Sequence, residues 1–301
     1  MPRRHGAPLP LRITPLTDPE TTPSSRRLAW LASDTEGVPV GSAFLRLFTK
    51  KGQDHLAELE GAVHPGERRR GAGSLLLEAA VDAARAEGRR SLIAQAESDS
   101  PGDRFLAARG FGRVLALTYA RLPLAGADLD RIAGIAEQPH PGYALTSWDG
   151  TVPAELAHTF AASRRAMDDM PMGDTDYGTV VWDVDRVLAA AAAIARRGEL
   201  LHTIAAIDTA DGSVVGFSEL VVPGDGRGDA QHYGTGVLPE HRGHGLGLWM
   251  KAEAIRHARA RFPELSGLLT DTADDNAPMN AVNDTLGYRP THRAVEYQLD
   301  L

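Results

Sequence analysis

Cysteine is absent from the 301 residues of this chain. Its absence excludes disulfide bonds, thiolate nucleophiles and metal sites built on cysteine. An excess of basic residues is also absent, because 32 lysines and arginines face 40 acidic residues and leave a net charge of −8. Proteins that bind nucleic acid need a basic face for the phosphates, so we expect no nucleic acid partner. The acidic balance instead favours cationic partners such as amines.

Long hydrophobic runs are missing as well. The opening residues, MPRRHGAPLP, place no apolar segment after their basic residues, and no later run is long enough to cross a bilayer. We therefore expect a cytoplasmic protein without a membrane partner. With 43% hydrophobic and 24% charged residues, the composition is that of a folded protein, and the length suffices for two domains.

The predicted elements occur in the same order twice, which indicates a tandem duplication. Hydrophobic periodicity and turn residues define the elements of both halves. In the first half they are strands at 27–33, 40–48 and 55–63, a helix at 71–88, a strand at 90–97, a helix at 101–110 and strands within 111–124. In the second half they are strands at 200–208, 213–222 and 229–237, a helix at 246–262, a strand at 266–273, a helix at 277–287 and a strand at 288–301.

The domain boundaries follow from the duplication. We expect an N-terminal domain at 1–124, a linker at 125–141 where Pro and Gly interrupt the sheet pattern, and a C-terminal domain at 142–301. Only the second half has two helical stretches, at 153–167 and 185–197, before its central sheet. The corresponding part of the first half, TPLTDPETTPSS, is too short and too rich in proline to form them.

An eleven-residue pattern recurs within the duplication. VHPGERRRGAG begins at Val63 and VLPEHRGHGLG begins at Val237, 174 residues later. Each copy joins a strand to a helix. The first N–H groups of a helix lack internal partners and lie at the positive end of its dipole, and nearby glycines let a pyrophosphate approach them. Neither copy is GxGxxG or GxxxxGK[ST], so the dinucleotide and P-loop patterns are both excluded.

This pattern, Val-x-Pro-x-x-Arg-x-x-Gly-x-Gly between a strand and a long helix, resembles the acyl-CoA signature of the GNAT (Gcn5-related N-acetyltransferase) superfamily. The order of elements resembles tandem members of that family, in which one repeat can be inactive. The resemblance implies an α/β (α+β) fold with two GNAT-like domains, each a mixed, mostly antiparallel sheet in which two central strands splay apart. It also implies acetyl-CoA as the acyl donor. The implied cofactor-binding residues are Val237, Leu238, Pro239, Arg242, Gly243, His244, Gly245, Leu246, Gly247 and Asn276, and, in the first copy, Val63, Arg68, Arg69, Arg70, Gly71, Ala72 and Gly73.

The resemblance also directs attention to the catalytic groups. In the family, an acid for the leaving thiolate is often a Tyr four residues before a Gly-aromatic pair. Here those positions hold Leu106, which cannot act as an acid, and Asn283, which can hold a water or the CoA sulfur but cannot give up a proton. His232, on the strand leading into the second motif, is the candidate base, because its ordinary pKa suits neutral pH. A half-exposed histidine with a satisfied hydrogen bond is an equally good interpretation. Tyr288 is a fallback acid, although a packing role suits it better.

The segment MDDMPMGD is the candidate acceptor wall of the C-terminal copy. Asp168, Asp169 and Asp174 could receive a cationic amine and Trp182 could line an apolar side, although capping aspartates in a polar loop would look the same. Glu58 and Glu60 precede the motif of the first copy, but without the helical segment we expect an acceptor pocket to be hard to build there. We expect no metal, since His241 and His244 lack a third ligand at a plausible spacing.

These observations predict an acyl-CoA-dependent N-acetyltransferase. We expect the C-terminal copy to move acetyl to a primary amine of a small molecule in a ternary complex, because no nucleophile for a covalent intermediate stands out. The N-terminal copy would be non-catalytic. The alternative is a non-catalytic acyl-CoA-binding or sensing protein. Two repeats packed as an internal pseudo-dimer would suit a monomer, and a homodimer is the other option.

Overall fold

The computed structural model describes residues 11–17, 21–22, 25–178 and 180–301. The chain forms two compact units. The N-terminal unit comprises the residues up to Ala116, with 173–180 and 294–301, and the C-terminal unit comprises 117–172 and 181–293. The predicted α/β class, with one mixed, mostly antiparallel sheet in each repeat, is confirmed.

The sheet of the N-terminal unit has the order β1-β3-β4-β5-β6-β13. Only β5 and β6 pair in parallel, and β2 pairs with β3 beside this path. The strands are β1 (Arg12–Leu16), β2 (Thr21–Thr22), β3 (Ser25–Ser33), β4 (Pro39–Phe48), β5 (Leu56–Val63), β6 (Ser91–Glu97) and the last part of β13 (Arg289–Asp300). The helices are η1 (Pro65–Glu67), α1 (Ala72–Ala86) and α2 (Pro101–Ala107).

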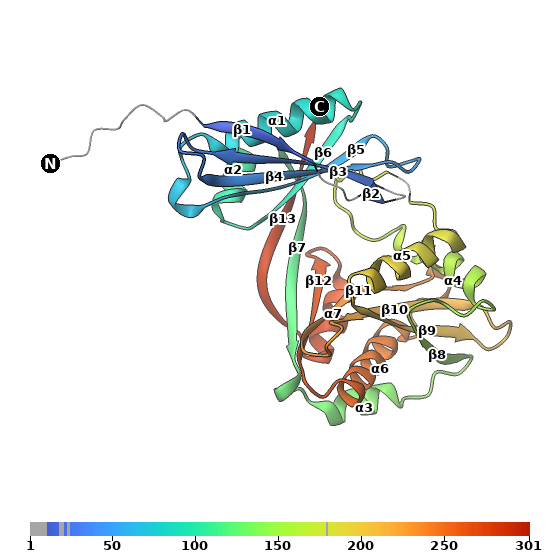
Figure 1. Cartoon of the computed structure of the whole chain (residues 1–301). Coiled ribbons are helices and arrows are strands. Elements are labelled where there is room, and N and C mark those ends of the chain that lie inside the picture. Colours follow the sequence, from blue (N-terminus) through green and yellow to red (C-terminus); the bar gives the residue numbers. More distant parts are fainter. Residues whose placement is uncertain (1–10, 18–20, 23–24, 179) are drawn as a thin grey trace. The chain divides into compact units, whose positions relative to one another are not determined.

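One face of this sheet is covered and the other is open. Helix α1 lies along the sheet (Figure 1). Leu76, Ala80 and Ala84, four residues apart on α1, pack with Leu45 and Leu59 of the sheet into one core. Since side chains alternate across a strand, the opposite face of β4 and β5 presents a different set of residues. These are Phe44, Arg46, Glu58 and Glu60. No helix precedes β4 in the described residues, as the short, proline-rich sequence predicts.

The sheet of the C-terminal unit has the order β7-β12-β11-β10-β9-β8, with only β11 and β12 parallel. Its strands are the end of β7 (Gly112–Pro123), β8 (Tyr143–Asp149), β9 (Leu200–Asp208), β10 (Val214–Val222), β11 (Gly228–Val237) and β12 (Leu265–Ala273). Its helices are η2 (Leu124–Gly126), α3 (Leu129–Ala136), α4 (Ala157–Ser163), η3 (Arg164–Met167), α5 (Val184–Arg196), η4 (Pro239–His241), α6 (Leu246–Arg261) and α7 (Ala277–Leu286). Helices α4 and α6 both contact β10, and every residue of this strand is buried.

Each unit is completed by a strand that comes after the other repeat in the sequence. The end of β7 pairs with β12 in the C-terminal unit, and the end of β13 pairs with β6 in the N-terminal unit. The expected linker at 125–141 contains α3, which packs against α6. Periodicity shows where strands occur but not which sheet they join. The expected boundaries at 124 and 142 therefore differ from the units of the structure.

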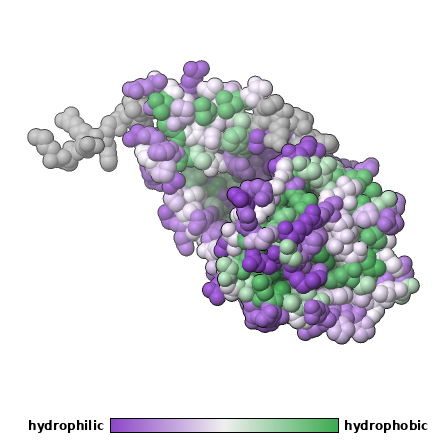
Figure 2. All heavy atoms as spheres, turned by 60° about the horizontal axis from the view of Figure 1, so that its bottom comes forward, coloured by the Kyte–Doolittle hydropathy of each residue, from purple (hydrophilic) through white to green (hydrophobic). Residues whose placement is uncertain are grey.

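The face of the molecule shown in Figure 2 carries both hydrophilic and hydrophobic residues. On the face shown in Figure 2, hydrophilic side chains are interspersed among hydrophobic ones. Among the helices that the structure describes, none has the length and apolar character to span a membrane.

Candidate functional site

The two copies of the repeated motif have the same backbone shape. Arg69 and Gly243 occupy equivalent positions and both have positive φ, 67° and 82°. Gly71 and Gly245, two residues on, also have positive φ and stand at the N-caps of α1 and α6. A left-handed arginine is disfavoured by roughly 1–2 kcal/mol relative to ordinary helical geometry. The first copy therefore has the same loop shape although arginine stands where the second copy has glycine.

The motif arginines are held in the same way. Arg68 Nε donates to the carbonyl oxygen of Val63 at 3.2 Å, and Arg242 Nε donates to that of Val237 at 3.0 Å. No side chain caps α1 or α6. The N–H groups that open these helices are therefore not covered by a cap, and each has a guanidinium nearby. That combination suits a pyrophosphate.

The remaining predicted cofactor residues have varied surroundings. Leu238, Leu246 and Ala72 are buried in the cores, and the carbonyl of His244 accepts a bond from His140 Nδ1 at 3.0 Å. Asn276 caps α7 by accepting from the N–H of Met279. Pro239 begins η4, and Val63, Val237 and Gly247 are half-buried. Arg70 pairs with Glu67, and Gly73 packs near Phe105.

The parallel strands part in each unit just before the motif. The last parallel pair is Leu59 with Ala94 in the N-terminal unit and Gln231 with Leu269 in the C-terminal unit. Beyond those pairs β5 continues to Val63 and β11 continues to Val237. This is the splay that the resemblance predicts.

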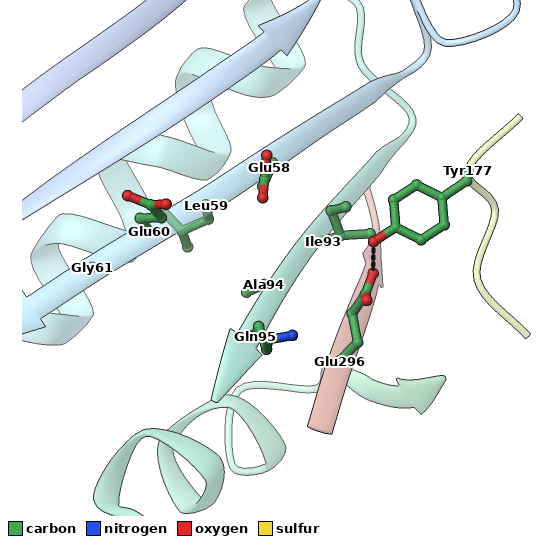
Figure 3. A pocket seen from close by; sticks show the side chains of 9 residues that line it. All are labelled: Glu58, Leu59, Glu60, Gly61, Ile93, Ala94, Gln95, Tyr177 and Glu296. Carbon is green, nitrogen blue, oxygen red and sulfur yellow. Dashed lines mark hydrogen bonds between the residues drawn. The ribbon is translucent and has the colours of Figure 1, made fainter. Parts of the chain in front are cut away.

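The splay of the N-terminal unit opens into a cavity of about 300 Å³. Residues of β5, β6 and β13 line it, and Tyr177 lies across from them with its hydroxyl bonded to Glu296 (Figure 3). The sequence led us to expect that an acceptor pocket would be hard to build in this copy, and the structure has a cavity there. The missing helices leave the face open, and the segment carrying Tyr177, which belongs to this unit, supplies a wall instead.

His232, the predicted base, is buried rather than half-exposed. In β11, Gly234 pairs with Glu219 and His232 with Leu220, so Tyr233 is an extra, bulged residue. A bulge reverses the facing of the residues before it. His232 is consequently 5% exposed on the side of α6. Burial and the charge of Lys251 hold its pKa well below the ordinary value.

Strand β5 has no bulge against β4, so its residues keep their alternation. Glu58 precedes Val63 by the same five residues that separate His232 from Val237. It faces away from α1, and its side chain is 33% exposed. The repeat therefore places an accessible carboxylate where the other copy has a buried imidazole. The shared offset could have identified Glu58 from sequence, but nothing in the sequence pointed to Tyr177 or Glu296.

Asn283 belongs to a buried polar cluster that the sequence did not reveal. Its Oδ1 accepts from Lys251 Nζ at 2.7 Å, and its Nδ2 donates to Thr272 Oγ1 at 3.0 Å. Lys251 is 1% exposed, lies 4.9 Å from the ring centroid of Tyr288, and has its pKa lowered by burial to about 7. Tyr288 is 4% exposed and burial raises its pKa. The amide of Asn283 is thus already bonded within the protein, and Leu106 of the first copy is buried in its core.

The predicted acceptor residues have different partners in the structure. Asp169 makes a two-pronged pair with Arg242, at 2.6 and 2.7 Å, and this arginine lowers the pKa of the carboxyl. Asp168 is exposed, whereas Asp174 belongs to the N-terminal unit and donates its N–H to Val114. Trp182 faces the guanidinium of Arg164.

That arginine forms a buried ion pair beside β11. Arg164 and Glu219 are each 7% exposed, and Nη1 and Nη2 of the guanidinium donate to the two carboxylate oxygens. The rings of Phe160, Phe217 and Trp182 surround the guanidinium, with centroids 4.4 to 4.7 Å from its carbon. The protein's own cation therefore fills this aromatic enclosure.

A group of possible metal ligands occurs away from His241 and His244. Ligand atoms of Asp149, His202 and His257 lie within 4.8 Å of one another. The two imidazoles stack in parallel, 3.7 Å apart and inclined by 7°. Lone pairs of parallel rings do not converge on one ion, so this arrangement does not fit a metal site.

Comparison with known proteins agrees with the duplicated geometry. The family model described as "Acetyltransferase (GNAT) family" matches residues 8–112 and 167–288. A mycothiol acetyltransferase of Clavibacter michiganensis is 32% identical over 270 residues, covering 88% of this chain and 78% of that protein. A mycothiol acetyltransferase of Actinosynnema mirum is 30% identical over 278 residues, covering 92% and 86%.

A solved structure is similar along the whole chain. A tandem GNAT protein from the clavulanic acid biosynthesis pathway is 28% identical with a TM-score of 0.74, covering 93% of this chain and 84% of that one. A GCN5-related N-acetyltransferase from Sphaerobacter thermophilus, 17% identical, shares the fold with a TM-score of 0.62 over 90% of this chain and 80% of that one. The chain therefore belongs to the acetyltransferase (GNAT) family, as an N-acetyltransferase that carries the family's domain twice in tandem.

Proposed function

We propose that this enzyme transfers acetyl from acetyl-CoA to a primary amine of a small molecule, by direct attack within a ternary complex. The observation that carries this proposal is the repeated loop. Both copies hold the motif arginine on the valine carbonyl, keep the left-handed residues, and lead into an uncapped helix. An arginine in a conformation that favours glycine would not be expected to persist without a reason such as ligand binding.

Acetyl-CoA fits these loops by its chemistry. Its pyrophosphate would lie on the uncapped N–H groups at the start of α1 or α6, near Arg68 or Arg242. Its pantetheine arm would bond to backbone groups near Val63 or Val237, in the splay. When bound, it supplies a thioester carbonyl that an amine can attack.

The transfer requires one proton to leave and another to arrive. The amine nitrogen forms a bond to the acetyl carbon, the C–S bond breaks, the amine proton goes to a base, and the thiolate takes a proton. The prediction that His232 is the base, with Asn283 or Tyr288 on the leaving-group side, has to be weighed against the burial of all three. Glu58 is an accessible carboxylate at the position equivalent to His232.

Release of free CoA from acetyl-CoA across a panel of small amines tests the proposal. Wild type is compared with Arg68→Ala, Arg242→Ala and the double variant, and Arg227→Ala serves as a control because its exposed side chain pairs with Glu264 and belongs to neither motif. We expect release that depends on an amine, is unchanged in the control and is lost in the double variant. The single variants assign the transfer to one copy, and His232→Ala tests the predicted base.

Two outcomes would contradict the proposal. Amine-dependent release that persists in the double variant would separate the reaction from the motif loops. Acetyl-CoA binding, detected as a thermal shift, without release for any amine would favour the alternative of an acyl-CoA-binding protein.

A further inference from the structure

The cavity of the N-terminal unit is lined by three carboxylates. Glu58 and Glu60 come from β5 and Glu296 comes from β13, while no cationic residue is among the nine described residues that line it. Figure 3 shows Glu58 and Glu60 on β5 and Glu296 on β13, on either side of β6, with Tyr177 reaching Glu296 from a separate segment. Because the neighbouring strands pair Glu58 with Ile93 and Glu296 with Gln95, these side chains lie on the same, open face of the sheet.

The negative charge in this cavity is only partly compensated. Glu58 pairs with Arg46 at 2.8 Å, outside the lining. Glu296 is 6% exposed, and its bonded partner is the neutral hydroxyl of Tyr177. Burial, with a contribution from the charge of Glu58, raises the pKa of Glu296. A buried carboxylate without a cationic partner is unfavourable, and a cation entering the cavity would relieve that.

The rest of the lining suits a short carbon skeleton. Ile93, on the same face as Glu58 and Glu296, contributes an apolar side chain, and Tyr177 contributes a ring. A cavity of about 300 Å³ matches the lower end of the range for small-molecule sites, roughly 300–1,000 Å³. An inorganic cation would not use the apolar part, whereas an organic ammonium would use both.

The position of the cavity ties it to the motif loop of the same unit. Its lining on β5 ends at Gly61, two residues before Val63 and seven before Arg68. A ligand in the cavity would lie at the splay between β5 and β6, which is where the arm of a cofactor held by this loop would reach. Strand β5 contributes to both the loop and the cavity, so the cavity lies in the same unit as the first copy of the motif.

We infer that this cavity binds a small organic molecule through a primary ammonium group, held by Glu296 and Glu58, with its carbon skeleton against Ile93 and the ring of Tyr177. In the reaction proposed above, this is where the acceptor amine lies, and that part of the inference rests on the proposed function. It places transfer in the N-terminal unit, in contrast to the expectation from sequence. The acceptor class is a primary alkylamine, and diamines suit the three carboxylates best.

Calorimetry in the absence of acyl-CoA tests the binding directly. The probe is 1,4-diaminobutane, and 1,4-butanediol is its uncharged counterpart. We expect the diamine to bind and the diol not to bind, with at least tenfold weaker binding of the diamine to Glu58→Gln and to Glu296→Gln. Glu264→Gln is the matched control, because that exposed carboxylate lies in the C-terminal unit. Circular dichroism verifies folding, and Glu58→Gln at a half-exposed site keeps the test available if the buried variant unfolds.

Equal binding of the diamine to wild type and to both pocket variants would overturn the inference. The absence of binding at about 10 mM diamine, on the order of the dissociation constants of the weakest specific ligands, would also overturn it. A second measurement separates it from the proposed function. CoA release with an amine that is unaffected by Glu58→Gln and Glu296→Gln would refute the acceptor site and leave the acetyltransferase intact. Diamine binding that these variants abolish, without CoA release, would refute the reaction and leave the binding site intact.

Discussion

Lys251 should make the stability of this protein depend on pH in the alkaline range. Burial lowers its pKa to about 7 in the folded chain, whereas an unfolded lysine titrates near 10.4. Between these values the unfolded state binds more protons, so the free energy of unfolding rises with pH. At about 1.4 kcal/mol per pH unit for one proton, we expect a gain of about 2 kcal/mol between pH 7.5 and 9.

Lys251→Met removes the titrating group and should flatten this rise. It also leaves Asn283 Oδ1 without its donor, at a cost of about 1–3 kcal/mol. The double variant Lys251→Met/Asn283→Leu avoids that penalty and isolates the effect of the charge. Lys51→Met serves as control, since Lys51 is exposed.

Urea denaturation at pH 7.5, 8.2 and 9 measures these free energies. A wild-type protein whose stability is flat over this range would refute the reasoning. A methionine variant with the same slope as wild type would show that the rise comes from another group.

Three further predictions concern the loops, the buried ion pair and the acid range. Gly243→Ala should lower the free energy of unfolding by about 1 kcal/mol, because the φ of Gly243 is positive, and Arg69→Gly should not lower it. Urea titrations of the two variants check this, and equal losses of stability would contradict it. Arg164→Ala should lower the free energy of unfolding by about 3–5 kcal/mol, because it leaves Glu219 buried and unpaired. The double variant Arg164→Met/Glu219→Leu should lower it much less. Similar losses of stability in both variants would argue against a charge effect. Tyr297 and Arg113 hold the pKa of Asp103 at about 2. The stability that this carboxylate contributes should therefore be present above pH 4 and be lost as the pH falls toward 2. Asp103→Asn should weaken this dependence in thermal melts recorded across the acid range.

The sequence predicted the elements well, because each is a local pattern. The helices after both motifs begin at Ala72 and Leu246, directly after the glycines that the pattern placed at their starts. The absence of helices before β4 was also predictable from a short segment rich in proline. Periodicity carries this information within ten to fifteen residues, so it needs no knowledge of the tertiary fold.

The surroundings of the candidate site residues depend on distant parts of the chain. One bulged residue, Tyr233, turns His232 toward α6, and its position shows only in the pairing with β10. Asp169 was a plausible amine ligand until the fold brought it to Arg242, 73 residues away. Tyr177 and Glu296 meet although 119 residues separate them. Local patterns cannot report such contacts.

The strands that complete each unit decide when each half can finish folding. Ser91 of β6 pairs with Asp300 of β13, which follows the whole C-terminal repeat in sequence, so the sheet of the N-terminal unit lacks this strand until that later segment has been synthesised. The cavity wall formed by Glu296 appears at the same late moment. Pairings between such distant positions slow folding, and an unpaired β6 offers an edge for wrong partners in the meantime. The half that the ribosome makes first is therefore the half that matures last.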